Sequence, residues 1–228
     1  MVKYLCIIQA RINSSRLPGK VMLDLAGKTL LERAYNSVCK SKKINKIVVA
    51  TSNLDQDDII ENKLRLLGID CFRGDLNNVL KRFFNASEVY QAINIVRVTA
   101  DNPMMDAQVI DDLISHYEEN DCNYSMFSNG VYGLSTEVFS KKILDEAFDN
   151  SNNDYEKEHV TPYILNNGKP SVIDMIKKYR KPEIRATIDT LEDYIKLQNF
   201  YLSCKENLTE PNIDSFILYM TKRNFLNE

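Results

Sequence analysis

The sequence lacks the features that mark several classes of protein. Its five cysteines are odd in number and contain no Cys-x-x-Cys pair, which argues against a disulfide framework and against a paired-thiol metal site. No apolar run approaches the roughly 20 residues that a membrane-spanning helix needs, so we expect no membrane partner. Cys6 and Cys71 lie within apolar, strand-like runs, which predicts buried thiols and a reducing, cytoplasmic location.

Low-complexity linkers and internal repeats are also missing, so we predict a single domain over residues 1–228. Hydrophobic residues make up 44% of the chain, which is enough to bury the core of one large α/β domain. Neither sign of charge dominates, because 29 basic and 32 acidic residues leave a net charge of -3. A nucleic-acid partner held through its phosphates is therefore not expected, and any anionic ligand must be captured locally.

Segments typical of strands and helices alternate along the first half of the chain, and the second half is less regular. In the first half, strands are predicted at 5–8, 44–51, 69–72 and 93–99, and helices at 29–38, 55–67, 78–89 and 106–118. Further strands are predicted at 124–127, 172–176 and 184–188, and further helices at 138–148, 156–165 with a break at Pro162, 190–204 and from 211 onward. This order predicts an α/β fold with a mostly parallel, doubly wound central sheet flanked by helices.

A basic stretch over residues 9–20 follows the first predicted strand. Arg11, Arg16 and Lys20 stand at the carboxyl end of that strand, where open α/β sheets bind ligands. Arginine pairs bidentately with phosphate oxygens and lysine acts as a point charge, so the stretch favours a polyphosphate such as a nucleoside triphosphate. It is not a P-loop, because Lys20 is followed by Val21. A solvated basic loop is the alternative interpretation.

Two aspartates also stand at the ends of predicted strands. Asp101 follows the strand at 93–99, and Asp189 ends the strand at 184–188. A pair of carboxylates beside a basic loop suits Mg²⁺, because Mg²⁺ prefers hard oxygen ligands and bridges triphosphate oxygens. Each aspartate alone is better explained as a helix cap or a turn residue, and it is the pair beside the basic stretch that favours the metal site.

Five further residues are candidates for contacts with substrate. His159 either binds an anion or moves a proton, or it is a hydrogen-bonded helix residue. Arg73 and Gly74 form either a ligand-contacting turn or an exposed corner. Glu137 and Arg185 have weaker claims, since either could belong to a structural ion pair.

Six short motifs occur in a fixed order along the chain, and together they carry a family resemblance. They are Gln-Ala-Arg-x-x-Ser-x-Arg-Leu-Pro-Gly-Lys (9–20), Val-Val-Ala-Thr-Ser (48–52), Phe-Arg-Gly-x-x-x-x-Val-Leu-x-Arg (72–82), Val-Arg-Val-Thr-Ala-Asp-x-Pro (96–103), Glu-His-Val-Thr-Pro-Tyr (158–163) and Thr-Ile-Asp-Thr-x-Glu-Asp (187–193). This set resembles the SpsF-type cytidylyltransferases of spore coat polysaccharide biosynthesis. These are related to the acylneuraminate and 3-deoxy-manno-octulosonate cytidylyltransferases, and the resemblance implies a GT-A-like nucleotidyltransferase fold.

The resemblance also implies roles for individual residues. Arg11, Arg16 and Lys20 would hold the phosphates of CTP. Asp101 and Asp189 would carry Mg²⁺. The other implied contacts are Ala10, Ser15, Thr51, Arg73 and Gly74 around the nucleotide, and Glu137, His159 and Arg185 near the acceptor. The chain departs from the family pattern after Arg-Gly, where it has Asp75 in place of serine and Asn78 in place of an acidic residue. The added carboxylate implies altered contacts to the base or ribose.

The implied reaction is transfer of CMP from CTP to an anionic acceptor with release of pyrophosphate, in surface polysaccharide or glycan biosynthesis. The acceptor would be a sugar acid, or a phosphorylated small molecule or phosphonate that gives a CDP-linked product. A homodimer is also implied, with segment 129–139 as a dimerisation arm or substrate lip. Two other classes stay open: a catalytically idle nucleotide-binding protein, and a GT-A glycosyltransferase. Asp101-Asn-Pro argues against the glycosyltransferase, because it supplies only one of the two carboxylates of an Asp-x-Asp motif.

Overall fold

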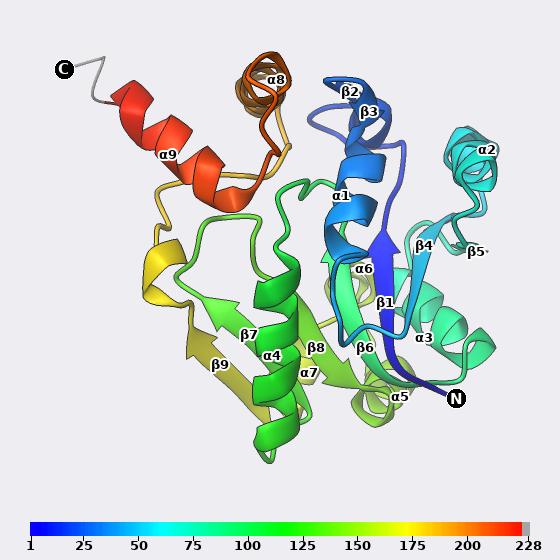
Figure 1. Ribbon diagram of the computed structural model, residues 1–228. Coiled ribbons are helices and arrows are strands. Elements are labelled where there is room, and N and C mark those ends of the chain that lie inside the picture. Colours follow the sequence, from blue (N-terminus) through cyan, green and yellow to red (C-terminus); the bar gives the residue numbers. More distant parts are fainter. Residues whose placement is uncertain (225–228) are drawn as a thin grey trace.

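The fold is built on one large sheet with helices on both faces (Figure 1). The computed structural model describes residues 1–224, with side chains described through residue 222. Within these residues, seven strands form the sheet in the order β5-β4-β1-β6-β8-β7-β9. Their bounds are β1 Val2–Gln9, β4 Lys46–Ser52, β5 Cys71–Gly74, β6 Ala92–Thr99, β7 Tyr124–Ser128, β8 Glu137–Ser140 and β9 Pro170–Asp174. Only β8 runs antiparallel to its neighbours, which confirms the predicted mostly parallel sheet.

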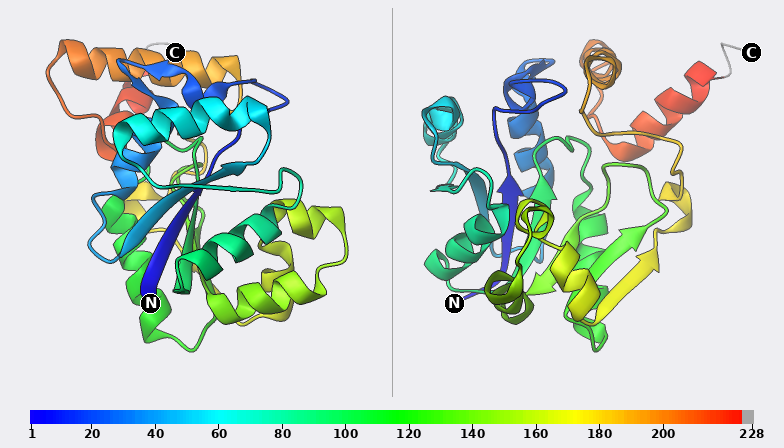
Figure 2. Two further views of the ribbon diagram at one scale, coloured as in Figure 1. Left: turned by 90° about the vertical axis from the view of Figure 1, so that its right-hand side faces the viewer. Right: turned by 180° about the vertical axis from the view of Figure 1, so that it is seen from behind.

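Helices cover the two faces of the sheet in separate groups (Figure 2). One face is packed by α1 (Leu30–Val38), α2 (Asp58–Leu67) and α4 (Ala107–Glu119), and the other by α3 (Val79–Val89), α5 (Lys141–Asn150), α6 (Asp154–His159) and α7 (Pro162–Asn167). Beyond the carboxyl ends of the parallel strands lie α8 (Leu191–Glu206) and α9 (Ile213–Asn224). Short elements complete the chain: η1 Lys20–Met22, β2 Asp24–Leu25, β3 Lys28–Thr29, η2 Asp55–Asp57 and η3 Lys177–Tyr179.

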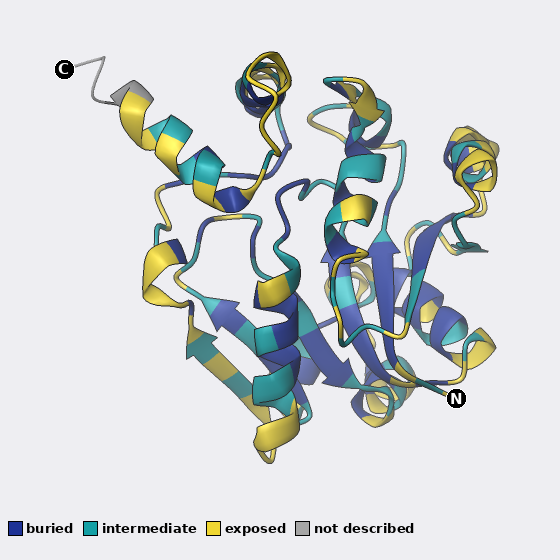
Figure 3. Cartoon of the chain, viewed as in Figure 1, coloured by how far each residue is buried: buried dark blue, intermediate teal, exposed yellow. Residues whose placement is uncertain are grey.

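Burial explains why the central strands read as continuous apolar runs. Residues 4–8 of β1 are all buried, because β1 is covered on both faces, whereas β9 at the sheet edge alternates between exposed and half-buried positions (Figure 3). Cys6 is buried as predicted, and Cys71 is only half-buried. No helix within residues 1–224 is both long and apolar enough to cross a membrane.

Contacts between chain neighbours set the ends of several predicted helices. Thr29 and Glu32 form a capping box at the start of α1, and Thr190 and Asp193 form another at the start of α8. Gly68 ends α2 in the left-handed conformation, with φ of 66°. The predicted break at Pro162 also occurs, between α6 and α7.

Three predicted elements are wrong. Residues 184–188 are not a sheet strand but make a single bridge to Tyr132, because their apolar side chains enter the core while backbone groups pair with loops. Arg73 and Gly74 are not a turn, since β5 continues through them against β4. Residues 138–140 belong to β8 rather than to the following helix.

Candidate active site

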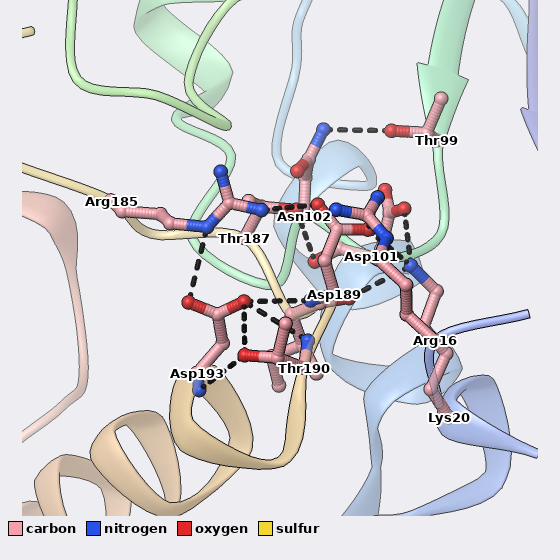
Figure 4. A network of polar contacts seen from close by, with 11 residues as sticks. Arg16, Lys20, Thr99, Asp101, Asn102, Arg185, Thr187, Asp189, Thr190 and Asp193 are labelled. Carbon is pink, nitrogen blue, oxygen red and sulfur yellow. Dashed lines mark hydrogen bonds and ion pairs between the residues drawn. The ribbon is translucent and has the colours of Figure 1, made fainter. Parts of the chain in front are cut away.

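Lys20 joins two carboxylates that are far apart in the sequence. Gly19 takes the left-handed conformation, with φ of 74°, and turns the chain into η1, which begins at Lys20. The Lys20 Nζ donates to Asp101 Oδ2 at 2.7 Å, to Asp189 Oδ1 at 2.9 Å and to the Ile188 carbonyl at 2.8 Å (Figure 4). The basic stretch and both predicted aspartates therefore meet at one point.

Asp189 is held by further cations. Arg16 Nη2 lies 2.9 Å from Asp189 Oδ1, and Arg185 pairs with Asp189 Oδ2 (Figure 4). Burial by itself would raise the pKa of the Asp189 carboxyl, but Lys20, Arg16 and Arg185 outweigh burial and hold the pKa below its ordinary value. Asp189 is therefore ionised at neutral pH.

A cavity opens beside this centre, at the carboxyl ends of β1 and β6. Of the predicted site residues, Ala10, Arg11, Ser15, Arg16, Lys20, Asp101, His159 and Asp189 line it. Its other walls come from Gln9, Val79 and Arg82, and from Arg97 and Thr99 of β6. The wall is thus rich in cations, which suits an anionic ligand.

A second cavity shares one wall with the first. Arg16, Arg97, Thr99, Asp101 and Asp189 line both cavities. The rest of the second cavity comes mainly from residues 126–133 and 135–137, with Asn102 and Thr187. Two ligands placed in these cavities would meet at the two aspartates.

Comparison with known proteins identifies the family of the chain. A sequence model of the family described as cytidylyltransferase matches residues 5–219. The chain belongs to the cytidylyltransferase family. Its activity is accordingly transfer of a CMP group from CTP.

Several relatives resemble this cytidylyltransferase over most of its length. An uncharacterized protein of Methanocaldococcus jannaschii is 38% identical over 93% of this chain and 87% of its own. The spore coat polysaccharide biosynthesis protein SpsF of Bacillus subtilis is 34% identical over 89% of this chain and 88% of its own. The structure of a cytidylyltransferase from Leptospira borgpetersenii covers 98% of this chain, and 95% of that chain is matched, with a TM-score of 0.86 and 27% identity. These similarities confirm the predicted family and fold.

The three residues predicted to contact the acceptor lie in different surroundings in the structure of the cytidylyltransferase. His159 lines the first cavity, and its ring lies 4.5 Å from that of Tyr155. Glu137 lines the second cavity, but its carboxylate accepts hydrogen bonds from Tyr124 and Thr161 and pairs with Arg97. Arg185 lines neither cavity.

Arg185 is instead held beside the second cavity by three neighbours. It pairs with Asp189, its Nε lies 3.1 Å from Asp193 Oδ1, and its guanidinium lies over the Tyr132 ring at 4.5 Å from the centroid. Asp193 in turn accepts from the backbone N–H groups of Asp189 and Thr190. Arg185 therefore orients Asp189 rather than facing either cavity.

Three residues predicted to surround the nucleotide, Thr51, Arg73 and Gly74, line neither cavity. Thr51 is buried and its Oγ1 donates to Asp57 Oδ2 at 2.9 Å. Arg73 donates to the Ser52 and Leu54 carbonyls and pairs with two acids of α2. These contacts brace the end of β4 against α2.

Sequence reasoning gave no role to Arg82 and Arg97, which line the cavities of the cytidylyltransferase, or to Asp57, which lines neither cavity but contacts the basic stretch. Asp57 has no distinguishing signal, because it stands among other acidic residues at 55–58. Arg82 does have a distinguishing signal in the sequence. It lies three residues after Val79 and four before Ala86, and this helical spacing places it on the buried face of α3. Arg97 has one too, since it is the single charged residue of β6.

Asp57 attaches the basic stretch (residues 9–20) to the end of β4. Its Oδ1 accepts from the Ile12 N–H at 2.8 Å, and its Oδ2 accepts from Thr51 Oγ1 and from the Ser52 N–H at 3.0 Å. Burial would raise the pKa of the Asp57 carboxyl, but these hydrogen bonds outweigh burial and lower the pKa. The ionised form is therefore the one that holds the loop.

Replacing Asp57 with alanine removes the acceptor of the Ile12 N–H, the Thr51 hydroxyl and the Ser52 N–H. We expect Asp57→Ala to lower the free energy of unfolding by about 3 kcal/mol, measured by urea denaturation at pH 7. The control is Asp55→Ala in the same short helix, because Asp55 is exposed, and we expect a change within about 0.5 kcal/mol. Equal losses in the two variants would contradict this role of Asp57.

Proposed function

We propose that this protein is a Mg²⁺-dependent cytidylyltransferase that moves CMP from CTP to an anionic acceptor, either a sugar acid or a phosphorylated small molecule, in surface polysaccharide or glycan biosynthesis. The observation that carries the proposal is the shared wall between the two cavities, formed by Arg16, Arg97, Thr99, Asp101 and Asp189. CTP occupies the first cavity and the acceptor occupies the second. The α-phosphorus then lies at the wall, within reach of both.

The basic loop is suited to the triphosphate. Arg11, Arg16 and Lys20 line the first cavity together, and arginine and lysine are the side chains that bind phosphate oxygens. Arg16 is 61% exposed and Arg11 is 41% exposed, so both can turn toward a ligand. Arg11 pairs with the exposed Glu158, and such an exposed ion pair is weak and exchanges readily for contacts to phosphate.

The two aspartates fit a magnesium ion. Asp101 and Asp189 both accept from the same Lys20 Nζ, so their oxygens converge on a position that one cation occupies. Within residues 1–224, no group of three or more His, Cys, Asp or Glu side chains forms a complete metal site. Mg²⁺ commonly binds through one or two carboxylates and completes its shell with water and substrate phosphates. When bound, it would neutralise charge on the transferring phosphate.

The reaction needs positioning and charge stabilisation from the chain. The acceptor oxygen attacks the α-phosphorus in line with the bond to the bridging oxygen of the β-phosphate. The new P–O bond forms, the bridging bond breaks, and pyrophosphate leaves with both electrons of that bond. Lys20 and Arg16 stabilise the charge that develops on the α-phosphate and on the leaving group. If the acceptor is a hydroxyl, its proton passes to water.

The second cavity has the polar lining that a sugar derivative needs. Hydroxyl and amide groups line it at Thr99, Asn102, Ser128, Asn129, Ser135 and Thr187. Arg16 and Arg97 line this cavity as well as the first, so both lie in the wall that an acceptor carboxylate or phosphate would face. Segment 129–139 forms much of this wall, which supports its role as a substrate lip. The similarity to SpsF supports the polysaccharide pathway.

Pyrophosphate release tests the function directly. Each of the four nucleoside triphosphates would be incubated with sugar acids and with phosphorylated alcohols, with Mg²⁺ or with EDTA. We expect pyrophosphate only with CTP, Mg²⁺ and a matching acceptor, together with an equal amount of a CMP adduct identified by mass spectrometry. Reactions without acceptor are the control. Binding of CTP without turnover on any acceptor would favour the idle nucleotide-binding protein, and transfer from a nucleotide-sugar would favour a glycosyltransferase.

A further inference from the structure

Arg82 is a buried arginine with unsatisfied hydrogen-bond donors. Arg82 is 2% exposed. Its Nε and Nη1 atoms are buried and have no hydrogen-bond partner among the described residues. Burial lowers the pKa of Arg82 to about 10, so the guanidinium remains charged at neutral pH. A buried charge without partners destabilises a fold, and native structures rarely keep one without a functional reason.

The position of Arg82 places this residue in the wall of the first cavity. Arg82 is in the first turn of α3, and helix side chains tilt toward the amino-terminal end, which here faces the carboxyl edge of the sheet. It lines the first cavity together with Val79, Ala10 and Arg11. A Cβ atom at Gly74 would lie 3.0 Å from Arg82 Cγ, so Gly74 leaves room for the arginine stem. The guanidinium is thus held in place before any ligand binds.

Arg82 and the two aspartates have different charged neighbours along the first cavity. The charged groups close enough to affect the pKa of Arg82 are Asp57, Arg11 and Asp75, whereas those that affect Asp189 are Lys20, Arg16 and Arg185. Sheet order agrees, because Asp57 and Asp75 follow β4 and β5 on one side of β1, and Asp101 follows β6 on the other side. If the triphosphate lies at the aspartates, as the proposed function requires, the nucleoside lies toward Arg82.

We propose that Arg82 donates hydrogen bonds to the acceptors O2 and N3 of the cytosine ring and so selects CTP over UTP. This inference rests on the proposed function. A guanidinium has only donors, and cytosine presents two adjacent acceptors. Uracil presents an N3–H donor at the same place, which would face the guanidinium. The apolar neighbours Val79 and Ala10 keep water away, so a mismatched base leaves buried donors without partners.

Replacement of Arg82 by methionine separates this role from a structural one. Arg82→Met keeps an unbranched side chain of similar length and removes the unpaired charge. We expect its melting temperature without ligand to equal or exceed that of the unaltered protein. Calorimetric titration should show CTP binding weakened about 10- to 100-fold, with binding of tripolyphosphate unchanged. Lys81→Met is the matched control, because Lys81 is the adjacent, exposed residue of the same helix, and we expect no change in either affinity.

The outcomes distinguish the two proposals. Unaltered CTP affinity in Arg82→Met would overturn the role of Arg82 and leave the proposed function standing. Equal loss of CTP and tripolyphosphate affinity would also overturn it, since Arg82 would then contact phosphate. Failure of the unaltered protein to bind CTP would overturn both proposals. If Arg82→Met does not fold, Arg82→Lys keeps the charge without the planar fork, and an unchanged ratio of CTP to UTP affinity in that variant would overturn the proposal.

Discussion

Asp101→Asn is expected to reduce turnover by at least about 100-fold while the protein stays folded. The Asp101 side chain is 24% exposed, faces both cavities, and its carboxylate accepts from Lys20. Asparagine keeps the shape and one acceptor oxygen for Lys20, but it loses the charge that would bind Mg²⁺. The measurement is the rate of pyrophosphate release from CTP over a range of Mg²⁺ concentrations, with the melting temperature as a test of folding.

A control variant at Asp121 and a second variant at Asp189 complete this experiment. Asp121→Asn is the control, because Asp121 is 94% exposed and pairs only with a surface lysine, and its turnover should not change. Asp189→Asn should lose turnover to a similar extent, but also some stability, because Arg16, Lys20 and Arg185 all pair with that carboxylate. Normal Mg²⁺-dependent turnover in both the Asp101 and the Asp189 variant would remove the metal assignment.

Arg97→Met is expected to lower the free energy of unfolding by about 3 kcal/mol at pH 7. Arg97 and Glu137 pair across β6 and β8, and each side chain is 15% exposed. Removing the arginine leaves the carboxylate largely buried with only the hydroxyls of Tyr124 and Thr161 as donors. Urea denaturation measures the loss. Lys169→Met is the control, because it breaks the exposed pair with Asp121 and should change stability by less than about 1 kcal/mol.

The size of this loss should depend on pH. Burial by itself would raise the pKa of Glu137, but Arg97 and the hydrogen bonds from Tyr124 and Thr161 outweigh burial and lower it. A carboxyl with a lower pKa in the folded state stabilises the fold fully above its unfolded pKa, about 4.3, and this contribution is lost as pH falls through the folded pKa. Without Arg97, burial dominates and protonation of Glu137 becomes favourable.

The difference in stability between Arg97→Met and the unaltered protein should therefore shrink as pH falls from 7 toward 4. The double variant Arg97→Met/Glu137→Gln should recover part of the loss at pH 7, because no buried charge remains unpaired. A loss that is independent of pH and is not reduced in the double variant would show that Arg97 contributes through packing alone.

Signals that act over a few residues were readable in the sequence. The helices predicted at 29–38, 55–67 and 190–204 begin or end at contacts between chain neighbours, namely the capping boxes at Thr29 and Thr190 and the left-handed Gly68, so their ends do not depend on distant contacts. The rule that ligand sites form at the carboxyl ends of parallel strands also linked the basic loop to Asp101 in advance. These signals were sufficient to predict the α/β sheet and the meeting of Lys20 with Asp101, whereas the strand from which Asp189 was placed is not part of the sheet.

Contacts between distant segments decided the rest. Residues 184–188 have the alternation of a strand, but their backbone groups pair with the loops at Tyr132 and Asp101, which no local pattern specifies. Arg73 carries the motif of a ligand contact, yet carbonyls and acids at the end of β4 and in α2 occupy its donors. Whether a charged side chain faces a ligand or a structural partner depends on which groups the fold places beside it.

The sequence by itself determined the class of fold, the family and the cluster of charges that meets at Lys20, because periodicity, caps and ordered motifs are properties of the chain alone. Only the tertiary structure decided that two cavities share a wall at Asp101 and Asp189, and that Arg82 Nε and Nη1 are left without partners while Arg97 pairs with Glu137. The physical reason is that the desolvation and pairing of a charge depend on neighbours from other strands and helices, and these neighbours are set only when the sheet and its helices pack together.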